Sequence, residues 1–177
     1  MKKLLLIIIL IIFPVPNSFS QWQTDGAPVP DTHFRKSVGD FGAFLLITDK
    51  AEELFDSWNK PGDLVPVSTT TQVKRNQVIT IAIIFTGCQS DLKGKCNATV
   101  DYLILKPDKS IYGDLKDVEL WVDKPAPEKG QVQLSLGNIN IGIEPNDPFG
   151  TYEVIAEVKD NNGKISIALN QNFEVIE

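Results

Sequence analysis

Along most of the chain, apolar and polar residues alternate with a period of two, which is typical of β-strands that bury one face. Segment 78–86 is apolar on both alternating faces, so we expect a central strand that is covered on both sides. Turn-forming residues, such as those at Pro107–Ser110 and Asp160–Gly163, separate the alternating segments. These patterns predict strands at 41–48, 67–73, 78–86, 97–106, 118–122, 132–136, 139–143, 151–159 and 164–175.

One segment follows the helical period instead. Asp49 has the side chain of a good N-cap, Glu52 follows it at capping-box spacing, and Pro61-Gly62 ends the pattern. Such a short helix is not stable alone and must pack on the sheet, so we expect its tryptophan, Trp58, in the core. The apolar stripe of this helix consists of Ala51, Leu54, Phe55 and Trp58.

The segment Asp147–Val154 resembles the turn into the penultimate strand of immunoglobulin-like domains, where an Asp, a small residue and a Tyr lead into the strand. The resemblance implies that Tyr152 forms a structural tyrosine corner, with its hydroxyl bonded to backbone a few residues upstream. Val154 stands where antibody domains carry their second Cys, so their inter-sheet disulfide is absent. We therefore expect an all-β protein, an immunoglobulin-like antiparallel β-sandwich of about 8–9 strands with one short helix, at about residues 50–59, after the first strand.

Short motifs spread over the chain also resemble a group of small, uncharacterised secreted proteobacterial proteins with a single immunoglobulin-like β-sandwich domain. The matching segments are Val38-Gly39-Asp40-Phe41, Thr48-Asp49 before the Trp-containing helix, Gly87-Cys88, Gly94-Lys95-Cys96-Asn97 and Gly150-Thr151-Tyr152. This group brings no assigned activity, so the resemblance implies a fold and export but no mechanism.

The first twenty residues have the pattern of a Sec-type signal peptide. Lys2 and Lys3 precede the apolar run Leu4–Phe13, and Ser18 and Ser20 provide the small residues that a signal peptidase reads. The run is shorter than the roughly 20 residues that cross a bilayer, although an uncleaved membrane anchor is the alternative. We expect a signal peptide at 1–20, an irregular leader at 21–40 and the sandwich domain at 41–177. The mature protein is then periplasmic or extracellular, with no stable membrane insertion.

Charge narrows the choice of partners. The whole chain has a net charge of −6, and removal of Lys2 and Lys3 leaves 15 of the 17 basic residues against 23 acidic ones, a net charge of −8. Lys and Arg are spread singly along the chain, whereas nucleic-acid binding needs a clustered basic surface. We therefore expect no nucleic-acid partner.

The cysteines indicate a structural disulfide. Cys88 and Cys96 are the two cysteines of the chain, and an exported protein reaches an oxidising compartment. Their spacing is wider than that of a dithiol redox motif and closes a short loop between strands.

Catalytic and metal-binding patterns are weak. His33 is the one histidine of the chain, so a Ser-His-Asp triad, a Cys-His pair or a zinc site would have to use it, and it lies in the leader. Asp160–Gly163 has oxygen ligands suitable for Ca²⁺, but the same residues favour a tight turn, which we prefer. We expect no catalytic residue, no metal and no cofactor.

Two tryptophans are candidates for surface recognition. Trp121 falls on the polar face of its strand, between Glu119 and Asp123, and Trp22 lies in the leader. An aromatic ring on a polar face contacts a partner or stacks on a sugar ring. The alternative is that the leader or the segment Lys124–Pro127 covers Trp121.

The sequence favours a secreted non-enzymatic recognition or accessory module, with a periplasmic or extracellular protein or a glycan as partner. The alternative is a structural subunit of the pilus type that assembles by strand exchange, with the leader as donor strand. The leader lacks the alternating apolar residues that a donor strand needs, so we expect a monomer. A hydrolase is a distant third hypothesis.

We predict that export is accompanied by cleavage between Ser20 and Gln21, because small residues follow the charged and apolar regions there. The intact mass of the protein recovered from the periplasm or the medium should equal that of residues 21–177. A recovered mass that still includes Lys2 and Lys3 contradicts the prediction.

Overall fold

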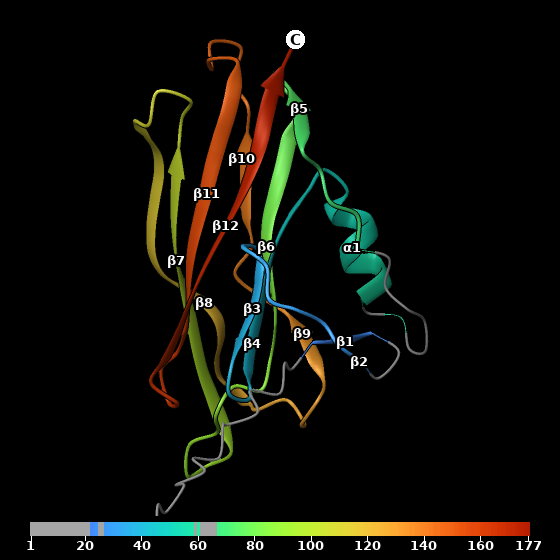
Figure 1. Ribbon diagram of the computed structural model, residues 1–177, viewed down its shortest axis with the longest axis vertical. Helices are drawn as coiled ribbons and strands as arrows, with labels where there is room; N and C mark the ends of the chain where they lie inside the picture. Colours follow the sequence, from blue (N-terminus) through green and yellow to red (C-terminus); the bar gives the residue numbers. More distant parts are fainter. Residues whose placement is uncertain (1–21, 25–26, 59, 61–66) are drawn as a thin grey trace, which may run out of the picture.

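The computed structural model describes residues 22–24, 27–58, 60 and 67–177 (Figure 1). The expected signal peptide, the predicted cleavage point and the Pro61-Gly62 end of the helical pattern lie outside these residues. Over the described part of the chain, no helix has both the length and the apolar character needed to span a bilayer.

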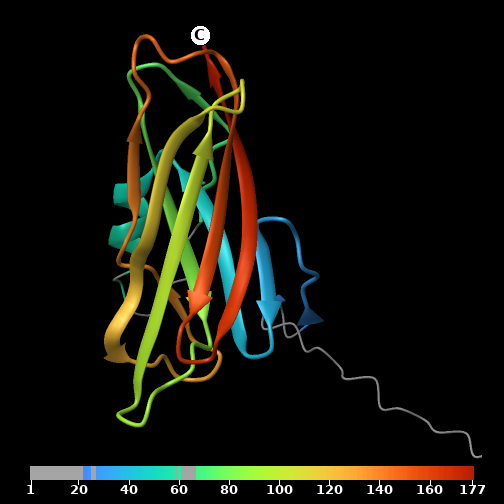
Figure 2. The same ribbon diagram turned by 90° about the vertical axis from the view of Figure 1, so that its left-hand side faces the viewer.

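Two sheets of five strands pack face to face (Figures 1 and 2). The first, sheet B, contains β3 (Arg35–Val38), β4 (Phe41–Thr48), β6 (Val78–Thr86), β9 (Val132–Leu134) and β10 (Ile139–Gly142). The second, sheet C, contains β5 (Gln72–Lys74), β7 (Lys95–Leu105), β8 (Ile111–Pro125), β11 (Gly150–Asp160) and β12 (Ile165–Ile176). The ends of the sequence-predicted strands 41–48 and 78–86 match β4 and β6. All pairs within the two sheets are antiparallel except the short parallel pair of β5 with β12.

The main core lies between the sheets. Strand β6 contributes alternate residues to it, and β7 and β11 contribute theirs from the opposite sheet, as the alternation predicts. The central members are fully buried: Ile79, Ile81, Ile83, Phe85, Val100, Tyr102, Tyr152, Val154, Ala156 and Val158.

A second apolar cluster covers the outer face of sheet B. Ala82 and Ile84, on the other face of β6, pack with Leu54 of the helix α1 (Ala51–Trp58). This confirms that the strand at 78–86 is covered on both sides. The contact also explains why such a short helix forms, because sheet B buries its apolar stripe.

The helix begins one residue later than its capping pattern suggests. The first helical backbone bond runs from Leu54 N to Lys50 O at 3.1 Å, so Lys50 holds the N-cap position that we expected for Asp49. The Asp49 carboxylate instead accepts a hydrogen bond from the Thr70 hydroxyl. A tertiary contact therefore outcompetes the local cap.

Residues 21–40 are not wholly irregular, contrary to expectation. A small hairpin of β1 (Gln23–Thr24) and β2 (Ala27–Pro28) precedes β3, which pairs antiparallel with β4. Strand β3 has the polar sequence Arg-Lys-Ser-Val, and it was missed because an edge strand is held by backbone bonds and does not need an alternating apolar face.

The expected strand at 67–73 is also wrong in its extent. Only Gln72–Lys74 is a strand among the described residues of this stretch. Thr70 N donates to Ile47 O at 2.8 Å. The chain just before β5 therefore bonds to the end of β4 at one point and does not pair with a strand along its length. Thr-rich composition favours a strand only where a neighbouring strand is within reach.

Backbone hydrogen bonds join the two sheets along both long sides of the sandwich. On one side, Asn170 N in β12 donates to His33 O at 2.8 Å. On the other, Leu136 N donates to Leu120 O in β8 at 3.2 Å. Gly137 lies so close to β8 that a Cβ there would stand 2.3 Å from Glu119 O, so a side chain does not fit at this position.

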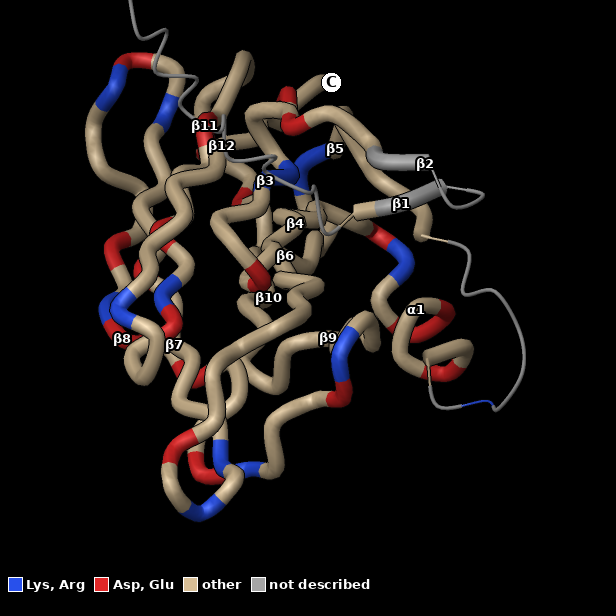
Figure 3. Tube along the Cα trace, turned by 60° about the horizontal axis from the view of Figure 1, so that its bottom comes forward, with Lys and Arg blue, Asp and Glu red and all other residues tan. Residues whose placement is uncertain are grey.

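The long edge strand β8 is irregular, and four register shifts interrupt its pairing with β7. Asp117 adopts a positive φ of 50° at one of these irregularities, where its N–H donates to Asp101 at 2.8 Å. Lys159 bridges the same two carboxylates, at 2.7 Å from Asp101 and 3.0 Å from Asp117. Figure 3 shows Lys and Arg interspersed with Asp and Glu along the described chain.

The turn before β11 has the geometry of a tyrosine corner. The Tyr152 hydroxyl donates to Pro148 O, four residues upstream, at 3.1 Å. Its ring is fully buried, stacked on Phe173 and edge-on to Tyr112. The Tyr112 hydroxyl in turn donates to the buried carboxylate of Asp147 at 2.6 Å. The bond predicted from the Asp–Gly–Tyr pattern is present.

We predict that Tyr152→Phe lowers the free energy of unfolding by about 0.5–1.5 kcal/mol, the net value of one hydrogen bond. The loss stays in this range because Pro148 is exposed and its carbonyl can bind water instead. Tyr112→Phe should cost more, about 1–3 kcal/mol, because it removes a donor from a buried carboxylate. Urea titration of both variants measures these losses, and a Tyr152→Phe variant as stable as wild type contradicts the corner.

We also predict that the folded protein resists tyrosine ionisation. Burial raises the pKa of Tyr152 to about 12. Burial raises the pKa of Tyr102 as well, and burial together with the bond to Asp147 raises that of Tyr112. Tyrosines in the unfolded chain ionise near pH 10, so stability is retained below about pH 10 and falls as the pH rises towards 12.

Tyrosinate absorbance and circular dichroism, followed together during alkaline titration, test this prediction. The phenol absorbance should rise only as the β-sheet signal is lost, whereas the urea-unfolded chain should titrate near pH 10. Ionisation of the phenols near pH 10 with the sheet signal intact contradicts it.

Candidate ligand-binding site

A pocket of about 340 Å³ lies at the side of the sandwich where α1, β8 and the β9–β10 connection meet. Figure 2 shows α1 and the end of β8 on this same side of the molecule. None of the eight described residues that line the pocket is charged. They are Phe55, Trp58, Trp121, Gln133, Leu134, Ser135, Leu136 and Asn138, and we call them the aromatic pocket.

Trp121 is the side chain from β8. Its ring packs against Phe85 of the main core, with the ring centroids 5.9 Å apart. Its indole Nε1 donates to Pro125 O at 2.8 Å, so the ring is held in one orientation. Lys124 lies over the ring, with Nζ 5.7 Å from its centroid. Trp121 is therefore partly buried, and both the core and the pocket contact it.

The sequence left two positions open for Trp121, exposed on a polar face or covered by the leader or by Lys124–Pro127, and the contacts with Lys124 and Pro125 agree with cover by Lys124–Pro127. Strict alternation placed Leu120 and Val122 inward and Trp121 outward. The register of β8 shifts here, since Ala98 pairs with Trp121 but Thr99 pairs with Glu119. A bulge of this kind lets two successive residues approach the same face, so Leu120 is buried and Trp121 also packs against the core.

Phe55 and Trp58 are the side chains from α1. They are three residues apart and therefore lie on the same face of the helix. Both are partly buried and pack against the second apolar cluster. We expected Trp58 to be a core residue, but it lies at the margin of that cluster and lines the pocket as well.

The polar side chains come from β9, which carries Gln133, and from the β9–β10 connection, which carries Ser135 and Asn138. The Ser135 hydroxyl donates to Asn138 Oδ1 at 2.8 Å and accepts from Ile83 N at 3.2 Å. Asn138 Nδ2 donates to Ser135 O at 3.2 Å, which leaves its second N–H available. Gln133 adds a side-chain amide to the pocket lining. The pocket thus offers amide donors and acceptors beside aromatic faces.

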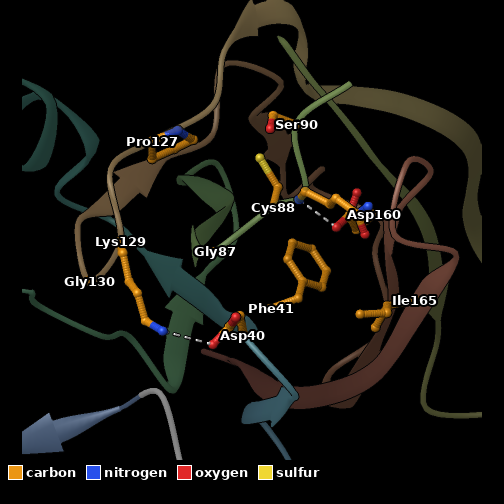
Figure 4. Close-up of a pocket in the computed structure, with 11 residues that line it drawn as sticks. Asp40, Phe41, Gly87, Cys88, Ser90, Pro127, Lys129, Gly130, Asp160 and Ile165 are labelled. Carbon is orange, nitrogen blue, oxygen red and sulfur yellow. Dashed lines mark hydrogen bonds and ion pairs between the residues drawn. The ribbon is translucent and has the colours of Figure 1, made fainter. Parts of the chain in front are cut away.

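A second pocket, of about 430 Å³, opens at one end of the sandwich (Figure 4). Its apolar wall is formed by Phe41 and Ile165, and its rim carries Lys129, which pairs with Asp40 at 3.7 Å. Gly87 also lines it, and a Cβ there would stand 1.7 Å from the Asp40 carbonyl, at a positive φ of 69°.

The predicted disulfide between Cys88 and Cys96 is present beside this end pocket. The buried Asp160 fixes the same region, because its Oδ2 accepts from Gln89 N at 2.8 Å and its Oδ1 from Gly163 N at 3.1 Å. Both carboxylate oxygens are used within the protein, which agrees with a structural turn at Asp160–Gly163. The polar groups of the end pocket are therefore largely paired with one another, and the aromatic pocket is the better candidate.

The remaining sequence candidates lie elsewhere. His33 is exposed, with its ring edge-on to Phe34 at 4.9 Å. Trp22 is partly buried, donates from Nε1 to Lys36 O at 3.2 Å and packs edge-on to Phe44, so it does not join Trp121. In the described residues, no group of three or more His, Cys, Asp or Glu side chains is placed to hold a metal ion.

No protein-family model and no curated protein matches the chain. Several solved structures resemble it in fold. A Niemann-Pick type C2 protein from the Japanese carpenter ant is 12% identical with a TM-score of 0.41, over 75% of this chain and 89% of that one. The CARDB domain of a Pyrococcus furiosus protein is 10% identical with a TM-score of 0.39, over 82% and 97%. A family 123 glycoside hydrolase from Clostridium perfringens is 13% identical with a TM-score of 0.41, over 76% and 27%.

The predicted fold class is confirmed: the protein is an immunoglobulin-like β-sandwich. At these low identities the likeness concerns the fold alone and assigns no activity.

Proposed function

We propose that the protein is an exported, non-enzymatic binding module that takes a small uncharged ligand in the aromatic pocket. The observation that carries this proposal is the convergence of Phe55, Trp58 and Trp121, from a helix and a strand far apart in sequence, on one uncharged concavity. Ligand sites are typically concave, mostly apolar and supplied with a few well-placed polar groups.

The pocket has the size and rigidity of a ligand site. Its volume of about 340 Å³ falls within the range of roughly 300–1,000 Å³ that such sites occupy. Trp121 is held by the core residue Phe85 and by its bond to Pro125, so little freedom is lost when a ligand binds. A preorganised ring of this kind favours recognition.

The polar groups of the pocket suit recognition better than bond-breaking chemistry. Ser135 is the one hydroxyl-bearing residue that lines the described pocket, and its hydroxyl donates to the Asn138 amide oxygen. An amide does not accept a proton at neutral pH, so it does not activate the hydroxyl as a nucleophile. The same amides can hydrogen-bond a ligand without ionising.

Two further features fit an exported monomer. The Cys88–Cys96 disulfide is typical of proteins that pass into an oxidising compartment. The bulged edge of β8, with Asp117 and its partner Lys159, discourages the addition of another strand. We therefore favour a monomeric module over assembly by strand exchange.

We predict that the mature protein binds N-phenyl-1-naphthylamine, a neutral fluorescent probe, at one saturable site. Trp121→Ala and Trp58→Ala should each weaken binding by at least about tenfold, which corresponds to about 1.4 kcal/mol, because each removes an aromatic wall. Probe fluorescence during titration measures the affinity.

Phe149→Ala is the matched control. Phe149 is an exposed aromatic residue that does not line the pocket, and its ring lies under the Arg75 guanidinium, 3.7 Å from the ring centroid. This variant should bind the probe as wild type does, and circular dichroism should show that all three variants are folded. Absence of saturable binding, or equal losses in all three variants, contradicts the proposal.

A further inference from the structure

We infer that the ligand of the aromatic pocket is a neutral pyranose sugar, free or as a residue of a glycan; this inference rests on the proposed binding function. Three properties of the pocket lead to it: flat aromatic faces, amide groups beside them, and the lack of charge among the described lining residues. Each property concerns a different feature of the ligand.

The aromatic faces match the geometry of a sugar ring. A pyranose presents C–H groups on one face, and their partial positive charge is attracted to the negative face of an aromatic ring. Trp121 and Trp58 line the pocket from two different elements, β8 and α1. The ammonium of Lys124, which lies over Trp121, belongs to an exposed side chain that a ligand can displace at little cost.

The amides match the edge of a sugar ring. The Gln133 amide can donate to or accept from sugar hydroxyls, and the second N–H of Asn138 can donate to one. A hydrocarbon chain in the same place would cover these amides and leave them without hydrogen-bond partners, which is unfavourable. The pocket therefore favours a ligand that carries both an apolar face and hydroxyls.

The absence of charge among the eight lining residues argues against a phosphate or carboxylate ligand, which needs Arg, Lys or several N–H donors. Contact through one or two rings and a few hydrogen bonds gives modest affinity. We expect a dissociation constant on the order of 1 mM for a single sugar residue.

The three tryptophans of the chain provide a built-in test. Indole N–H signals of ¹⁵N-labelled mature protein, assigned with single Trp→Phe variants, are followed while methyl β-glucopyranoside, methyl β-galactopyranoside, methyl α-mannopyranoside or methyl N-acetyl-β-glucosaminide is added. At least one glycoside should move the signals of Trp58 and Trp121 saturably and leave that of Trp22 in place. Glycerol, which has hydroxyls but no ring, should move none of them.

Gln133→Leu separates the sugar assignment from the binding function. This variant keeps the aromatic walls, so it should bind N-phenyl-1-naphthylamine at least as tightly as wild type does. It should bind the glycoside at least about fivefold more weakly, since one hydrogen bond is worth about 1 kcal/mol. Equal glycoside affinity in Gln133→Leu and wild type overturns the assignment.

The outcomes distinguish the two proposals. If the neutral probe binds and no glycoside moves the two signals, the sugar inference is wrong and the binding function stands. If neither probe nor glycoside binds, both are wrong. Shifts produced equally at all three tryptophans indicate a general solvent effect and also overturn the sugar inference.

Discussion

The structure depends on one strand, β6, that is apolar on both faces. A strand of this kind must be covered by two layers, because each exposed apolar face costs about 25 cal/mol per Å². Its inner face, with Ile81 and Ile83, packs on sheet C, and its outer face, with Ala82 and Ile84, packs on α1. The helix that carries Phe55 and Trp58 is therefore held where it is by a requirement of the core, and the aromatic pocket lies at its margin.

The second element of the pocket depends on an irregularity. Strand β8 lies at the edge of sheet C, where a register shift lets Leu120 enter the core while Trp121 turns towards Phe85. The same strand is tied to the β9–β10 connection by the bond from Leu136 to Leu120. A bulge at a sheet edge thus serves two purposes: it makes the edge unsuitable for strand addition, and it redirects a tryptophan towards a pocket.

Much of the architecture follows from local patterns. The long alternating segments that became β6, β7, β11 and β12 were recognised because each buries one complete face or both. The Tyr152 corner and the disulfide followed from short motifs that form within one turn or loop. The sequence pattern did not predict the polar edge strand β3 or the full length of β8. Both depend on backbone hydrogen bonds to a neighbouring strand, and such bonds leave little trace in the pattern of side chains.

The sequence by itself determined the fold class, the central strands, the helix and the cysteine pair, because hydrophobic period and turn chemistry act over a few residues. It also singled out Trp121, but left open whether this residue is exposed or covered by a neighbouring segment. Only the tertiary structure decided that Trp58, Trp121 and Gln133 line one pocket and that Trp22 lies elsewhere. These residues come from three separate elements. They are brought together by the packing of α1 on sheet B and by the bulge in β8. Both features depend on contacts between residues far apart in the chain, which the local pattern does not record.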